Sequence, residues 1–182
     1  MYWCNYKKHT GLALLCSVLF CTACKPGVKE SGAALKYFDL TGYLSVDTAR
    51  LNHLNKLVFK TVTHNGNTQS KKVKISDWGR ELSLFTASDI NKPAWKNSYK
   101  VIDEYPLLLY IANDPELKMQ KMVIKRDKQQ IKWIVIINNT KNLLYSSTER
   151  LTYYPDSLYL IVKDQHVKLM GNNHYRIEGV IE

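Results

Sequence analysis

The hydrophobic and polar positions of this chain change their spacing several times, and each change predicts a different element. Apolar residues at helical spacing follow Asp39, which predicts a helix over residues 39–54 with Asp39 at its N-cap. Alternating stretches at 56–64 and 68–76 then flank Asn65-Gly66, the strongest short signal for a tight hairpin turn. The pattern therefore predicts that a helix and a hairpin open the folded part.

A second, shorter helix is predicted directly after the hairpin. Ser76 and Asp77 offer N-caps, and the helix should end near Ala87. Three large apolar residues lie at helical spacing along it and should face the core: Trp78, Leu82 and Phe85.

From Ser98 onward the chain alternates as a series of strands separated by turn residues. The predicted strands cover residues 99–103, 107–112, 118–126, 131–138, 143–154, 158–169 and 175–181. Their short connections make neighbouring strands antiparallel. The strand at 131–138 is apolar on both faces, so we expect it near the centre of the sheet with a helix behind it.

These elements together predict an α+β fold made of an N-terminal helix, a hairpin, a short helix and a large antiparallel β-meander. A sheet with this many strands must twist, so we expect a curved, half-barrel-like shape. By its length, the folded part at residues 36–182 is a single domain.

The first 23 residues have the pattern of an export signal. Lys7 and Lys8 precede an apolar run at residues 11–20, which is too short to span a bilayer. The run ends in Thr22-Ala23-Cys24, which resembles the lipobox of bacterial lipoproteins. The alternative is an ordinary cleaved signal in which the cysteine falls there by chance.

The lipobox resemblance implies an address and an anchor. Cleavage would follow Ala23, and Cys24 would carry a diacylglyceryl thioether and a further acyl chain, such as palmitate. Residues 1–23 would be the signal peptide and 24–35 a lipidated tether. Lys25 stands where an Asp would retain a lipoprotein at the inner membrane, so we expect the outer membrane, facing the periplasm.

Cysteine and charge content agree with an exported, tethered domain. Of the four cysteines only Cys24 would survive cleavage, which leaves no internal disulfide and no cysteine nucleophile. Loss of Lys7 and Lys8 leaves 24 basic and 16 acidic side chains, a net charge of +8. The densest basic stretch, at 118–132, predicts a local patch that could approach anionic head groups; the alternative is a mixed, solvated surface.

Residues with catalytic or metal-binding patterns are scarce. The histidines of the mature chain show no zinc-ligand spacing. His166 and His174 flank the last predicted hairpin, where a cross-strand position could bring them face to face. No serine-hydrolase motif and no phosphate-binding glycine loop occurs. We therefore expect no cofactor, no metal and no enzymatic activity, and export argues against nucleic acid as a partner.

Aromatic residues give the clearest suggestion of a ligand surface. The chain has twelve tyrosines, and an aromatic groove on the concave face of the sheet could hold acyl chains or sugars. The candidate ligand-binding residues are Trp133, Tyr145, Tyr153 and Tyr159. The alternative is that tyrosine simply suits half-buried strands.

Three phrases of the mature chain carry a family resemblance. DINKPAW (89–95), NNTKNLLY (138–145) and LTYYPDSLY (151–159) resemble lipoproteins of Bacteroidota-type bacteria, a family that implies no particular activity. The order of elements also resembles half-barrel lipid and lipoprotein carriers of the bacterial envelope, in architecture only.

Two functions remain open at this stage. The first is a non-enzymatic module that binds a hydrophobic ligand, a glycan or an envelope protein on the concave face. The second is an envelope hydrolase with an unrecognised site. A deep apolar cavity would favour the first, and a pocket that joins a histidine, a carboxylate and a hydroxyl would favour the second.

Lipidation at Cys24 is directly testable. The variant Cys24→Ser should accumulate as a larger precursor, because neither the thioether nor the subsequent cleavage can occur. Metabolic labelling with a fatty-acid probe, read on a gel, checks this expectation. Labelling of the variant at the level of the unsubstituted chain would contradict it.

Overall fold

The computed structural model describes residues 35–182, which form one compact unit. Cys24 and the predicted signal and tether, apart from Leu35, lie outside the described residues. Within residues 35–182, no helix is both long and apolar enough to cross a membrane. The helical elements are α2 (Leu40–Leu54), α3 (Trp78–Glu81), α4 (Ser83–Thr86) and the short 3-10 helix η1 (Pro93–Trp95).

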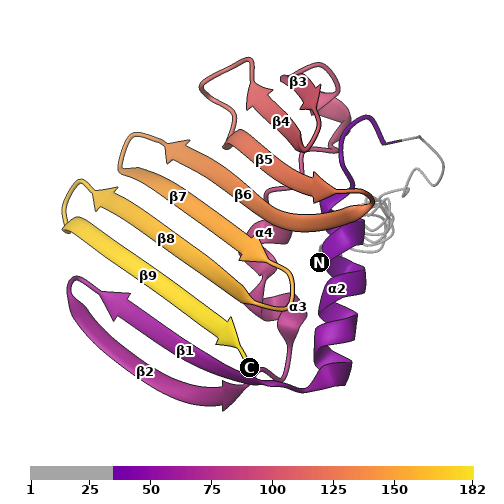
Figure 1. Ribbon diagram of the computed structural model, residues 1–182. Helices are drawn as coiled ribbons and strands as arrows, with labels where there is room; N and C mark the ends of the chain where they lie inside the picture. Colours follow the sequence, from indigo (N-terminus) through magenta and orange to yellow (C-terminus); the bar gives the residue numbers. More distant parts are fainter. Residues whose placement is uncertain (1–34) are drawn as a thin grey trace, which may run out of the picture. The chain divides into compact units, whose positions relative to one another are not determined.

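Nine antiparallel strands form one open sheet in the order β2-β1-β9-β8-β7-β6-β5-β4-β3 (Figure 1). The strands are β1 (Leu57–His64), β2 (Asn67–Lys74), β3 (Tyr99–Glu104), β4 (Leu107–Ala112), β5 (Met119–Asp127), β6 (Gln130–Lys141), β7 (Tyr145–Tyr154), β8 (Leu158–Val167) and β9 (Gly171–Ile181). The last strand pairs with β1, so the early hairpin extends the meander at its C-terminal side. The predicted antiparallel sheet is confirmed.

The helices cover one face of the sheet, and Figure 1 shows α3 and α4 behind the strands. The Asp39 carboxylate accepts a hydrogen bond from the Gly42 N–H, as expected of an N-cap. The helix α2 buries Leu40, Leu44 and Leu51 against the sheet. The expected first helix is therefore present and packed on the strands.

The expected second helix is in fact two short helices. Leu82 has φ −95° and ψ 15°, outside the helical region, and it separates α3 from α4. Trp78, Leu82 and Phe85 are nevertheless all fully buried. The break at Leu82 divides the predicted helix into α3 and α4, but the three apolar side chains still lie in the core as expected.

The strand ends at the β6–β7 and β8–β9 turns differ from those expected. Leu143 and Leu144 were expected in β7, and Leu169 in β8, but all three lie in hairpin loops. The Asn142 side chain accepts hydrogen bonds from the N–H groups of Leu144 and Tyr145. These bonds hold Leu143 and Leu144 in the β6–β7 turn, so β7 begins only at Tyr145. Gly171, with φ +81°, closes the second turn and starts β9 earlier than predicted.

One row of paired residues crosses the centre of the helix-covered face. Ile134, Tyr153, Tyr159 and Gly179 pair in register from β6 to β9. A Cβ atom at Gly179 would overlap the Tyr159 ring. The missing side chain at position 179 is therefore what allows the Tyr159 ring to lie across β9.

Gly179→Ala should lower the free energy of unfolding by about 1–3 kcal/mol, because the added methyl group overpacks the Tyr159 ring. Urea unfolding of the full-length chain, followed by tryptophan fluorescence, measures the change. Gly79→Ala is the matched control, since a Cβ there approaches only Asp77 Oδ1, at 3.3 Å. Equal losses in the two variants would contradict this account of Gly179.

Candidate functional site

The four aromatic residues expected to bind a ligand do not share a surface. Tyr153 and Tyr159 are fully buried beneath the helices, where they belong to the core. Trp133 is half-buried and alternates with the buried Ile134, so it lies on the other face of the sheet. Tyr145, at the start of β7, is half-buried and donates a hydrogen bond to Ser147 Oγ. The structure therefore brings together no aromatic groove from these residues.

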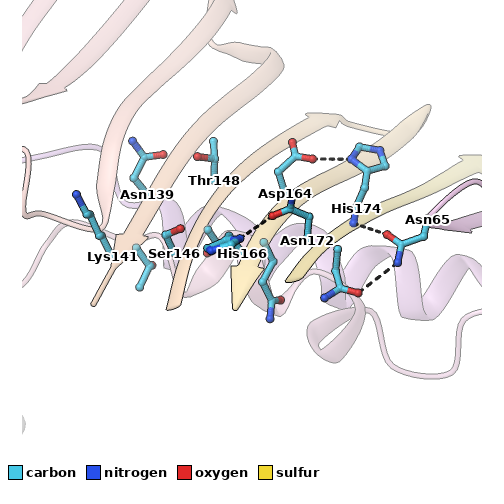
Figure 2. Close-up of a pocket in the computed structure, with 13 residues that line it drawn as sticks. Asn65, Asn139, Lys141, Ser146, Thr148, Asp164, His166, Asn172 and His174 are labelled. Carbon is cyan, nitrogen blue, oxygen red and sulfur yellow. Dashed lines mark hydrogen bonds and ion pairs between the residues drawn. The ribbon is translucent and has the colours of Figure 1, made fainter. Parts of the chain in front are cut away.

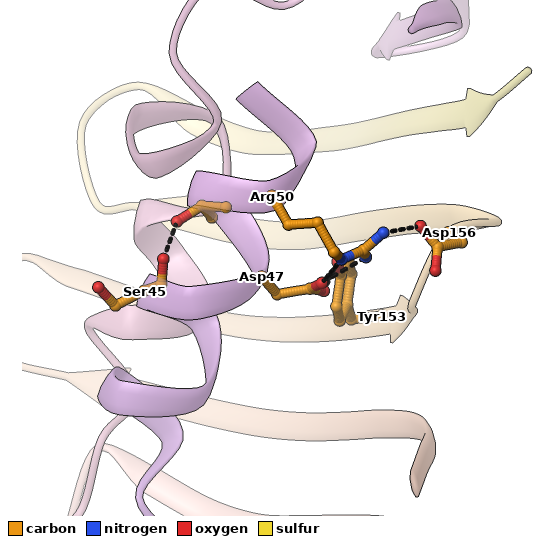
Figure 3. A network of polar contacts seen from close by, with 6 residues as sticks. Ser45, Asp47, Arg50, Tyr153 and Asp156 are labelled. Atoms are coloured by element: carbon orange, nitrogen blue, oxygen red, sulfur yellow. Dashed lines mark hydrogen bonds and ion pairs between the residues drawn. The ribbon is translucent and has the colours of Figure 1, made fainter. Parts of the chain in front are cut away.

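Tyr153 is instead part of a polar network that joins α2 to the sheet (Figure 3). Its hydroxyl donates to the Asp47 carboxylate, which is 7% exposed. Arg50 contacts Asp47 and also donates to Asp156 Oδ1, at 2.5 Å, in the β7–β8 turn. The network fixes the helix to the sheet at two points and leaves the Tyr153 hydroxyl no room for a ligand.

Tyr159 makes the corresponding link to α3. Its hydroxyl donates to Glu81 Oε1 at 2.5 Å, and Lys60 Nζ of β1 contacts the same oxygen at 2.5 Å. The Tyr159 ring also packs edge-on against Trp78, with ring centroids 6.0 Å apart. Both buried tyrosines are therefore structural, and the helix-covered face is closed by its own side chains.

A polar groove lies at the end of β6–β9 that carries the β6–β7 and β8–β9 loops. It has a volume of about 580 Å³, and Figure 2 draws the 13 residues that line it. The set holds five side-chain amides, four hydroxyls, two imidazoles, one carboxylate and one ammonium group, and no aliphatic or aromatic hydrocarbon side chain. The lining residues are Asn65, Asn139, Thr140, Lys141, Ser146, Ser147, Thr148, Asp164, Gln165, His166, Asn172, Asn173 and His174.

Hydrogen bonds fix the two imidazoles of the groove. His166 Nδ1 lies 2.7 Å from Asn172 Oδ1, and His174 Nδ1 lies 2.6 Å from Asp164 Oδ1. Because amide and carboxylate oxygens can only accept, each Nδ1 carries the proton in these contacts. This contact uses Nδ1 of His166 and not Nε2. The imidazoles do not face each other directly, because His166 pairs with Asn172 in the register and His174 with Asp164.

A cross-strand row in the groove has the residue types of a hydrolytic site. Ser146 pairs with His166, and His166 pairs with Asn172. A hydroxyl, an imidazole and an amide thus stand side by side on one face, where directly opposite Cβ atoms are typically about 4.5–5.5 Å apart. The Ser146 hydroxyl is not hydrogen-bonded to His166 among the described residues.

Metal ligands do not converge in the described part of the chain. Among residues 35–182, no three His, Cys, Asp or Glu side chains are grouped so that they could hold an ion. His64 stacks on Tyr175 with ring centroids 4.4 Å apart, beside the hairpin turn. These positions favour structural or hydrogen-bonding roles for the histidines.

The basic stretch at 118–132 does not form one patch. Arg126 pairs with Asp103, and Lys132 lies 3.4 Å from Asp127. Lys121 and Lys125 are exposed on β5, on the face that the helices leave free. The basic side chains of this stretch are therefore dispersed over a strand and a turn.

Sequence reasoning singled out His166 and His174 but not the amides and hydroxyls around them. The available signal was a run of polar residues on both sides of two hairpin turns, which was interpreted only as turn chemistry. Comparisons of the chain with family models, curated proteins and solved structures found no match.

The buried tyrosines predict how stability depends on pH. Burial first, and the hydrogen bond to Asp47 second, raise the pKa of Tyr153 far above its ordinary value. Burial and the bond to Glu81 do the same for Tyr159, and burial raises the pKa of Tyr99 to about 12. Since the unfolded chain ionises its tyrosines near pH 10, this stabilisation is complete below about pH 10 and is lost above it.

We expect the free energy of unfolding to fall above about pH 10, by about 1.4 kcal/mol per pH unit for each tyrosine that stays protonated only in the folded state. Tyr153→Phe should make this fall less steep, as measured by urea unfolding across an alkaline pH series. Tyr105→Phe, which alters an exposed ring, controls for the removal of a phenol. The same slope in Tyr153→Phe as in the unsubstituted chain would refute the assignment.

Proposed function

We propose that this chain is a cell-envelope lipoprotein whose folded domain is a non-enzymatic binding module for a glycan. In this proposal, lipid on Cys24 holds the protein at the outer membrane, facing the periplasm. The lipobox-like residues Thr22-Ala23-Cys24 and the lack of any later cysteine in the sequence support the anchor. The polar groove between the strand ends supports the binding role.

The composition of the groove carries the assignment of ligand class. Each hydroxyl of a sugar both donates and accepts a hydrogen bond, and the amides and hydroxyls that line the groove also offer both. The one carboxylate of the groove, Asp164, is already engaged by His174, so the lining does not favour a cationic ligand. A volume of about 580 Å³ is within the range of small-molecule sites.

The proposal moves the working surface away from the concave face expected from the sequence. We infer that the sheet curls as a half-barrel around α2, α3 and α4, which fill its inner side. An acyl chain has no aromatic groove to enter there, since Tyr153 and Tyr159 are buried. A glycan at the strand ends is the remaining class of ligand that the described side chains fit best.

The experiment is a binding screen of the full-length protein against an array of neutral oligosaccharides. A polyoxyethylene detergent should be used, because the head group of a sugar-based detergent would compete. Thr148→Ala should weaken binding about fivefold, as expected for the loss of one hydrogen bond. Thr152→Ala is the matched control, since it makes the same change on the same face of β7, away from the groove.

Binding to none of the array sugars, or equal losses in Thr148→Ala and Thr152→Ala, would overturn the glycan proposal. Asn172→Ala offers a second measurement, because it removes a groove amide and frees Nδ1 of His166. The folded state of every variant is checked by the midpoint of urea unfolding.

The row Ser146, His166 and Asn172 supports hydrolysis as a second candidate. In such a site His166 would take the proton from the Ser146 hydroxyl as that oxygen attacks an ester carbonyl, and would give it to the alcohol that leaves. Water would then hydrolyse the acyl-enzyme with His166 again as the base, and Asn172 would orient the imidazole. Hydrolysis of a p-nitrophenyl ester that is lost in both Ser146→Ala and His166→Ala, and kept in Thr152→Ala, would favour the enzyme. Unchanged hydrolysis in these variants would exclude it.

A further inference from the structure

Four of the most exposed large apolar side chains of the domain lie on two neighbouring hairpin loops. Leu143 and Leu144, in the β6–β7 loop, are 85% and 60% exposed. Leu169 and Met170, in the β8–β9 loop, are 91% and 80% exposed. These side chains contribute little to the core, and a group of exposed apolar residues is typical of an interaction site. We call these four residues the apolar tip.

Backbone and side-chain hydrogen bonds hold the two loops together. The Lys168 N–H donates to the Leu144 carbonyl oxygen at 3.0 Å, which joins one loop to the other. Asn142 Oδ1 accepts from the Tyr145 N–H at 2.9 Å, and the Met170 N–H donates to the Val167 carbonyl at 3.0 Å. The two loops are therefore linked to each other, and the four residues of the apolar tip are held near one another.

The charges beside the apolar tip are of one sign. Lys141 precedes the first loop and Lys168 lies in the second, and both are exposed. The acidic residue nearest to the loops in these strands, Asp164, is paired with His174. The ammonium groups of Lys141 and Lys168 form no ion pair with the carboxylates of residues 35–182. Exposed hydrocarbon next to such groups matches the boundary of a bilayer, where acyl chains lie below anionic head groups.

We propose that the apolar tip inserts into the interface of an anionic lipid bilayer. Leu143, Leu144, Leu169 and Met170 enter the boundary of the acyl chains, and Lys141 and Lys168 contact anionic head groups. The proposal stands on residues 141–170 and depends neither on lipid at Cys24 nor on sugar binding in the groove.

The test uses full-length protein with a tryptophan reporter at the apolar tip. Leu169→Trp is mixed with phosphatidylcholine vesicles, with or without phosphatidylglycerol, whose acyl chains carry bromine as a quencher. Val46→Trp is the matched control, because Val46 is 73% exposed but lies on α2. Subtracting the spectrum of the unsubstituted chain removes the signal of the native tryptophans.

We expect brominated anionic vesicles to quench the reporter at position 169 at least about threefold more than the reporter at position 46. Any attachment through the N-terminal segment acts on both variants, so the difference reports the tip. Adding Lys141→Gln and Lys168→Gln to the Leu169→Trp chain should weaken binding to phosphatidylglycerol vesicles about fivefold for each lysine removed.

Equal quenching at positions 169 and 46 would overturn the proposal, and the apolar tip would then be better explained as a contact for a protein. The role of the charges would be overturned if quenching at position 169 changed neither with the phosphatidylglycerol content of the vesicles nor on replacement of the two lysines. Loss of sugar binding in Thr148→Ala leaves the quenching unchanged, so this proposal and the proposed glycan site fail separately.

Discussion

The Asp47 carboxylate joins α2 to the sheet. A charge that is almost excluded from water is costly unless its oxygens are fully bonded, and Asp47 receives the Tyr153 hydroxyl and the Arg50 guanidinium. Removing the Tyr153 hydroxyl would leave the buried Asp47 carboxylate without one of its partners, which typically costs about 1–3 kcal/mol. Arg50 extends the contact to Asp156, so the position of α2 is tied to the β7–β8 turn.

The two faces of the sheet differ in what covers them. The face under the helices is closed by large side chains and by two buried tyrosines with carboxylate partners, Tyr153 and Tyr159. The other face has no helix on it within residues 35–182, and its strand ends carry amides, hydroxyls and imidazoles. A rigid layer on one side thus holds an accessible polar surface on the other, which is a common arrangement for binding sites.

Most of the fold was predictable from sequence, because short-range chemistry sets it. The Asp39 cap, the Asn65-Gly66 turn and the alternation of the later strands act within a few residues, and these elements are present as expected. The face of the sheet on which each tyrosine lies was not predictable, because it depends on a hydrogen-bond partner that is distant in the sequence. Tyr153 and Tyr159 looked like groove aromatics, but Asp47 and Glu81 lie more than 70 residues away from them in the chain.

The loop ends were mispredicted for a related reason. Leu143, Leu144 and Leu169 continue an apolar pattern, so they resembled strand residues. The Asn142 side chain and the left-handed backbone of Gly171 decide where those strands end. Neither effect changes the pattern of apolar residues from which the strands were predicted. The groove, built from polar residues of four strands, becomes visible only when the register is known.

The alternating connections of the sheet separate the two ends of the molecule. Arg50 holds the β7–β8 turn, whereas the β6–β7 and β8–β9 loops lie at the opposite ends of the same strands. Sequence change in those two loops leaves every contact of Asp47 intact. The scaffold can therefore tolerate sequence change in these two loops while keeping its core, as antibody domains do in theirs.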